Sequence, residues 1–164
     1  MSHHAPPGLG AAPAPEPDVS CRCEGSATLE GLVTVPVTLA FRYSAADPYA
    51  VRMVVETSVT RPVHWVFARD LLAEGLSRPA GLADVQVWPV PRRARRLGAG
   101  RGAVRIRVSS PGGTTTLSVK AACLRAFLGR TLEVVAAGAE STAPHLDDAL
   151  VSWLGRERRD DGVA

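Results

Sequence analysis

The sequence predicts an α+β fold, in which runs of adjacent antiparallel strands are interrupted by helices. Several segments alternate apolar and polar residues, which is the period of a strand with one buried face. Other segments carry leucines at helical spacing. Because the strand segments follow one another in runs, the order favours α+β over a doubly wound parallel sheet.

The first half of the chain predicts a meander of three strands. Apolar residues occupy the odd positions of Val33–Tyr43, and the alternation returns over residues 51–55 and 63–67. Pro36 cannot donate a ladder hydrogen bond, so we expect a sheet edge or a bulge there. The segment Ala46-Asp47-Pro48 predicts the turn between the first two strands.

The third strand is expected to run directly into a short helix. From Ala68 the period changes, because the leucines at 71, 72 and 76 fit one helical face. We expect Asp70 to cap the N-terminus of this helix and Gly75 to weaken or end it. The strand and the helix therefore meet without a loop.

The second half of the chain roughly repeats this order with a hairpin and longer helices. Residues 84–90 give a weak strand signal and residues 104–108 a clear one. The segment Ser110-Pro111-Gly112-Gly113 predicts a turn into a strand through Val119. From Lys120 a long helix is predicted, with an apolar stripe of Leu124, Phe127, Leu128, Thr131, Leu132 and Val135. A second C-terminal helix is predicted from the spacing of Leu146, Leu150, Trp153 and Leu154.

Length and composition predict one domain. The chain has 164 residues, of which 46% are hydrophobic, which is room for one core. We expect a disordered Pro/Ala-rich tail at residues 1–18, a single domain at residues 19–154 and a charged tail at residues 155–164. No stretch approaches the roughly 20 apolar residues of a membrane span, and the first ten residues do not resemble a signal peptide. A cytosolic protein without membrane insertion is therefore expected.

No segment carries a recognisable catalytic motif, so we expect a protein that is not an enzyme and holds no cofactor or metal. Gly98, Gly100 and Gly102 are spaced G-x-G-x-G before a strand, which favours a hairpin loop over a phosphate loop. Cys21 and Cys23 share one face of a strand but lack zinc-site spacing. With three cysteines in total, the pattern predicts reduced thiols and no disulfide framework.

Three aromatic side chains, Trp65, Phe67 and Trp88, are expected to pack in the core. His64 lies beside two of them on a predicted strand. No nucleophilic serine motif or acidic pair lies close to it in sequence, so we expect His64 on the surface or on a sheet face.

One basic cluster is present, at Arg92, Arg93, Arg95 and Arg96. Only one of the 19 basic residues is a lysine, which indicates a GC-rich genome and weakens any functional interpretation of the arginines. A solvated loop is the baseline, because like charges repel. Two further interpretations are a docking site for an acidic partner and a phosphate contact. Between these two we favour the acidic partner, since no aromatic stacking platform flanks the cluster.

Gly138 is the other candidate for partner binding. The long helix is expected to end near Ala137, where a glycine can adopt the positive φ of the position after the helix. The chain must then redirect the terminal helix. A larger residue at 138 would strain this turn by roughly 1 kcal/mol and misplace that helix.

Four stretches together resemble one family. They are Asp47-Pro48-Tyr49-Ala50-Val51, Trp65-Val66-Phe67-Ala68-Arg69-Asp70-Leu71-Leu72-Ala73-Glu74-Gly75-Leu76, Asp84-Val85-Gln86-Val87-Trp88-Pro89 and Ser109-Ser110-Pro111-Gly112-Gly113. In order and spacing they resemble the SsgA/SsgB-like proteins, the sporulation and cell-division regulators of actinomycetes. The similarity runs from about Val19 to Leu154. Within these stretches Trp65, Phe67, Arg69, Asp70 and Trp88 are motif residues expected to have structural roles.

The resemblance implies a non-enzymatic protein with a whirly-like α+β fold that assembles as a homotrimer. It implies a protein-interaction scaffold in the cytoplasm at the division septum, which helps to localise the tubulin-like ring protein FtsZ or to guide septal and spore-wall remodelling. Other SsgA/SsgB-like paralogues are further possible partners. The alternative is a single-stranded nucleic-acid-binding whirly-like protein, which the missing aromatic platform disfavours.

Overall fold

The computed structural model describes residues 17–29, 32–58, 60–90 and 102–140. The arginine cluster, the second C-terminal helix and the charged tail lie outside these residues. So do Gly98, Gly100 and nearly all of the N-terminal tail.

Seven strands form one antiparallel sheet within the described residues, in the order β4-β3-β2-β1-β7-β6-β5. In chain order the elements are β1 (Val19–Leu29), β2 (Val33–Ser44), β3 (Asp47–Glu56), β4 (Val63–Ala68), α1 (Arg69–Gly75), β5 (Val85–Pro89), β6 (Ala103–Ser110), β7 (Gly113–Lys120) and α2 (Ala121–Val134). Two meanders of three strands, β2–β4 and β5–β7, each run directly into a helix, at Ala68 and at Lys120, as expected. The α+β prediction is thus confirmed for these elements, but β1 pairs with both β2 and β7 and joins the two meanders into one sheet.

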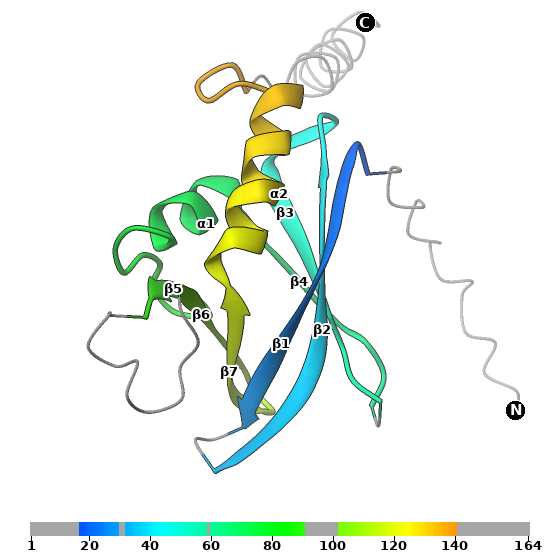
Figure 1. The fold of residues 1–164 in the computed structure, drawn as a ribbon, viewed down its shortest axis with the longest axis vertical. Coiled ribbons are helices and arrows are strands. Elements are labelled where there is room, and N and C mark those ends of the chain that lie inside the picture. Colours follow the sequence, from blue (N-terminus) through cyan, green and yellow to red (C-terminus); the bar gives the residue numbers. More distant parts are fainter. Residues whose placement is uncertain (1–16, 30–31, 59, 91–101, 141–164) are drawn as a thin grey trace, which may run out of the picture.

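Both helices pack against the concave face of the curved sheet (Figure 1). Helix α2 contacts β1 and β7 at the middle of the sheet. Helix α1 contacts β5 at one end of the sheet and β3 and β4 at the other, which the curvature brings together. The strands of both meanders and the two helices therefore share one hydrophobic core.

The core lies between this face and the two helices. Tyr43, Phe41 and Leu39 of β2 are buried at every second position, as the alternation predicted. The Phe41 ring lies against Phe127 of α2, with ring centroids 5.7 Å apart. At the start of the same strand Val33 is exposed, because no helix covers that end of the sheet.

The turn predictions agree closely with the structure. The turn between β2 and β3 is at Ala45–Ala46, slightly earlier than the Ala46-Asp47-Pro48 segment. The hairpin turn at Pro111–Gly112 is confirmed, and Gly113 has a φ of 127°. Pro36 lies at an edge, since β2 pairs with β3 only from Thr38 onwards.

The helix ends required two corrections. Ala68, in extended conformation, is the N-cap of α1, and Asp70 lies exposed in the first turn and caps nothing. Helix α1 ends at Gly75 as predicted, and this glycine packs closely on β5, because a Cβ at that position would lie only 2.2 Å from Cγ1 of Val87. Helix α2 ends at Val134, before Ala137, and Leu132 of its predicted stripe is exposed.

Candidate functional site

Arg69 is a buried charged residue at the point where β4 becomes α1. Its side chain is 3% exposed and reaches the C-terminal end of α2. The Nη1 atom donates hydrogen bonds to the Thr131 carbonyl at 3.3 Å and to the Val135 carbonyl at 2.7 Å. The carbonyls at the C-terminal end of a helix carry partial negative charge, which favours a guanidinium there, and the Thr131 carbonyl also accepts the Val135 amide at 2.9 Å.

The same guanidinium also holds the sheet and the segment that follows α2. Nη1 donates to the hydroxyl of Tyr43 at 3.1 Å, and the guanidinium carbon lies 5.1 Å from the centroid of the Tyr43 ring. Nη2 forms an ion pair with the carboxylate of Glu140. Tyr43 in turn donates to the Pro48 carbonyl at 3.1 Å. Arg69 therefore connects α1, β2, α2 and Glu140 through a single side chain.

Gly138 lies in the segment that these contacts anchor, which we call the clamped loop (residues 135–140). Arg69 binds the Val135 carbonyl at the start of the loop and the Glu140 carboxylate at its end. The Tyr49 hydroxyl donates to the Glu140 carbonyl at 2.8 Å. Between the anchors the chain turns, with the Ala139 amide donating to the Ala136 carbonyl at 3.0 Å. Gly138 has a φ of +78°, and a Cβ there would find nothing within 4 Å. The positive φ predicted for Gly138 is confirmed, but it shapes a turn four residues after α2 and does not cap the helix.

The contacts of this network favour an ionised Glu140 carboxylate and a neutral Tyr43 phenol. The hydrogen bond from its own backbone amide lowers the pKa of Glu140, and hydrogen bonds from Arg69 and from the Gly138 amide act in the same direction, against the effect of burial. Burial raises the pKa of Tyr43, although the Arg69 charge opposes this. At neutral pH the carboxylate is therefore ionised and the phenol is neutral, which is the state that the contacts require.

The other motif residues occupy different places. Phe67 is in the core as expected, while Trp65 is half-buried at the edge of a groove. Trp88 is half-buried beneath Arg107, whose guanidinium carbon lies 5.6 Å from the centroid of the Trp88 ring, so Trp88 is not a core residue. His64 is exposed on β4, as predicted. The pairing of Glu140 with Arg69 was not predicted, because nothing in a separation of 71 residues signals such a pair.

A second feature is an apolar groove of about 630 Å³ on the part of the concave face that α2 does not cover. Its walls are parts of six strands and their connections, and it includes Leu29, Leu32, Val33, Val63 and Trp65. Leu32 is 85% exposed and Val63 is 49% exposed. The strand positions Leu29, Val33 and Val63 continue the alternation of the core strands beyond the reach of the helices, and Leu32 of the β1–β2 connection adds to the apolar surface left open.

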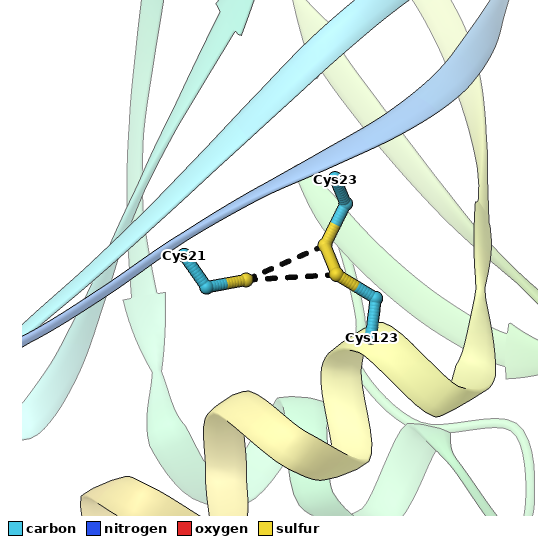
Figure 2. A group of neighbouring side chains, drawn as sticks. All are labelled: Cys21, Cys23 and Cys123. Carbon is cyan, nitrogen blue, oxygen red and sulfur yellow. Dashed lines mark hydrogen bonds between the residues drawn. A yellow bond between two sulfur atoms is a disulfide. The ribbon is translucent and has the colours of Figure 1, made fainter.

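A third feature is a group of three sulfur atoms between β1 and α2 (Figure 2). Cys23 and Cys123 form a disulfide, which corrects the expectation of reduced thiols. The fold places Cys123 opposite Cys23 with their Cα atoms 6.3 Å apart, although 100 residues separate them in sequence. Cys21 has a free thiol and is half-buried. The spacing of Cys21 and Cys23 could not reveal this group, because its third member is distant in sequence.

Comparison with known proteins identifies the family. The model of the family described as Streptomyces sporulation and cell division protein, SsgA, matches residues 37–140. The sporulation-specific cell division protein SsgB of Streptomyces coelicolor is 42% identical over 132 residues, which cover 80% of this chain and 92% of that protein. SsgB of Frankia casuarinae is 41% identical over 130 residues, covering 78% of this chain and 87% of that protein.

Solved structures agree with the sequence comparisons. One, from work on mutations in SsgB that correlate to longitudinal cell division during sporulation of Streptomyces coelicolor, has a TM-score of 0.65 and 43% identity, covering 74% of this chain and 91% of that chain. Another, an SsgA-like sporulation-specific cell division protein from Thermobifida fusca, has a TM-score of 0.68 and 32% identity, covering 85% of this chain and 98% of that chain. Within the described residues, neither helix has the length and apolar character needed to cross a membrane. The chain belongs to the SsgA family of sporulation and cell division proteins.

Proposed function

We propose that this protein is a non-enzymatic regulator of sporulation-specific cell division. It acts at the division septum as a protein-interaction scaffold that helps to localise the FtsZ ring or the septal and spore-wall remodelling machinery. The observation that carries this proposal is its family membership over residues 37–140, a span that contains the clamped loop and most strands of the groove. Relatives that share most of this chain are named sporulation-specific cell division proteins.

The clamped loop is the proposed contact surface for a division protein. Arg69 and Tyr49 anchor the loop, while the position of a Cβ on Gly138 is open to solvent. A rigid, exposed turn presents its backbone to a partner at little cost in conformational entropy. The arginine cluster at residues 92–96, outside the described part of the chain, is proposed as a second contact for an acidic partner surface.

The groove is the proposed surface for self-association into a homotrimer. Its lining is apolar and includes several exposed side chains, among them Leu32, Val33 and Val63. Burial of such side chains stabilises an assembly by roughly 25 cal/mol for each Å² removed from water. Light scattering at micromolar concentration is expected to give about three times the chain mass of 17.3 kDa. A monomer mass would contradict the trimer.

A fluorescent fusion tests the proposed role. Followed through sporulation beside labelled FtsZ, the fusion is expected to mark the sites of future septa at the same time as the FtsZ ring. The Gly138→Val fusion is expected to fold and to lose this localisation, because a β-branched residue is strained at a φ of +78°. Gly138→Asn is the matched control, since asparagine tolerates this conformation. A uniform distribution of the wild-type fusion would contradict the proposal, and normal recruitment by folded Gly138→Val would contradict the role of the loop.

A further inference from the structure

The three cysteines form a cluster that the family role does not explain. Cys21 and Cys23 project from the same face of β1, because alternate residues of a strand share a face (Figure 2). Cys123 is the third residue of α2 and faces them. The three sulfur atoms lie within 4.8 Å of one another. A structural disulfide needs two cysteines, so the third thiol in contact with both sulfurs requires a separate explanation.

The distances match those of a metal–thiolate site. The Sγ of Cys21 lies 3.4 Å from the Sγ of Cys23 and 3.6 Å from the Sγ of Cys123. In a tetrahedral site with zinc–sulfur bonds of about 2.3 Å, neighbouring sulfurs are about 3.8 Å apart. Two edges of the sulfur triangle are therefore close to the required length. The third edge is the Cys23–Cys123 bond, which opens when the disulfide is reduced.

Metal binds to cysteine as the thiolate, and the surroundings of this cluster act on the thiolate form in opposite directions. Cys123 lies in the first turn of α2, where the helix dipole stabilises negative charge. Burial raises the pKa of the Cys21 thiol, and the nearby charge of Arg130 opposes this only in part. Cys23 is buried, whereas Cys21 is half-buried and gives an ion access from solvent.

We propose that the reduced protein binds one thiophilic cation of the Zn²⁺ class through Cys21, Cys23 and Cys123. A phosphine and water reduce the disulfide to two thiols and give the phosphine oxide, with the two protons coming from the water; a dithiol gives the same two thiols and is itself oxidised to a disulfide. Binding then releases the thiol protons and forms three metal–sulfur bonds. No carboxylate or histidine of the described residues joins the three sulfurs, so a water or another exogenous ligand takes the fourth position.

The cation and the disulfide exclude each other, because both need the sulfurs of Cys23 and Cys123. Each of them links β1 to the first turn of α2. The protein thus keeps a cross-link at this place in either redox state, and the metal-bound state is the one suited to a reducing compartment.

Cadmium is the probe, because a cadmium–thiolate bond absorbs in the ultraviolet and so reports its sulfur ligands directly. The full chain is reduced with a phosphine, desalted without oxygen and titrated with Cd²⁺, and Zn²⁺ then displaces the Cd²⁺. We expect one Cd²⁺ per chain. Cys21→Ser, which keeps Cys23 and Cys123, is expected to weaken binding by more than the 10–100-fold that loss of an outer-shell partner costs. A double substitution of His3 and His4 by alanine is the control for unrelated metal binding and is expected to leave the absorption unchanged.

The oxidised wild-type chain is the matched control, since it has the same sequence with two ligands blocked. It is expected to give no thiolate absorption on addition of Cd²⁺. Far-ultraviolet circular dichroism checks that Cys21→Ser is folded. Equal affinity of Cys21→Ser and the reduced wild type would overturn the proposal, and so would a reduced wild-type chain that does not bind one ion with thiolate absorption.

Discussion

Replacement of Arg69 by methionine removes the side chain that holds the clamped loop and keeps a similar volume. The change deletes hydrogen bonds to the buried Tyr43 hydroxyl and Thr131 carbonyl and to the partly buried Val135 carbonyl. A hydrogen bond to a charged group contributes about 1.5–3 kcal/mol, and Tyr43 retains its own bond to Pro48, so we expect a loss of about 2–4 kcal/mol. That is a large part of the about 5–15 kcal/mol by which a domain is stable.

Urea unfolding followed by circular dichroism measures this loss, and Arg105→Met is the control. Arg105 is exposed on β6, so its replacement is expected to change the free energy of unfolding by less than about 0.5 kcal/mol. Arg69→Lys keeps the charge without the planar fork and is expected to fall between the two. In Arg69→Met, amide hydrogen exchange is expected to accelerate first in residues 131–140. A free energy of unfolding for Arg69→Met within 1 kcal/mol of that of Arg105→Met would refute the clamp.

Three further predictions follow from named contacts. Because the folded-state pKa of Glu140 is below its ordinary value of 4.5, its ionised form stabilises the protein above that pH. This stabilisation is lost as the pH falls through the folded pKa, so the urea midpoint of Glu140→Gln should decrease less than that of wild type between pH 6 and pH 3; parallel curves would contradict this. Gly75→Ala should destabilise by about 1–3 kcal/mol through collision with Val87, whereas Gly129→Ala, whose Cβ meets nothing within 4 Å, should be neutral or stabilising in the same urea experiment. Val63→Glu in the groove should give a monomer mass in light scattering, while Leu82→Glu, 88% exposed and outside the groove lining, should not; equal masses would argue against the groove as the interface.

The strands and the strand-to-helix junctions were predictable, because their signals are local. The alternation from Val33 to Tyr43 reports a buried face, and Pro111 and Gly112 report a turn through their own backbone preferences. The joining of the two meanders by β1 was not predictable in the same way. Pairing of β1 with β7 is a contact between segments about 90 residues apart, and no periodicity encodes it.

In the candidate site, too, the features with local sequence signals were predictable and those that depend on long-range packing were not. The positive φ of Gly138 follows from its residue type, whereas the partnership of Arg69 with Glu140 depends on how α1 and α2 pack. Asp70 is a typical capping residue, but α1 begins one residue before it, and that placement makes Ala68 the cap. Cys123 joins Cys21 only because α2 starts directly after β7 and lies across β1.

The most direct test of a role in sporulation-specific division is to count FtsZ rings in sporulating cells of a strain that lacks this gene. We expect sporulating cells of this strain to assemble few regularly spaced FtsZ rings. Reintroduction of the wild-type gene should restore the rings, and Gly138→Val should not. Regular FtsZ rings and normal spore septa in the strain without the gene would contradict the proposed function.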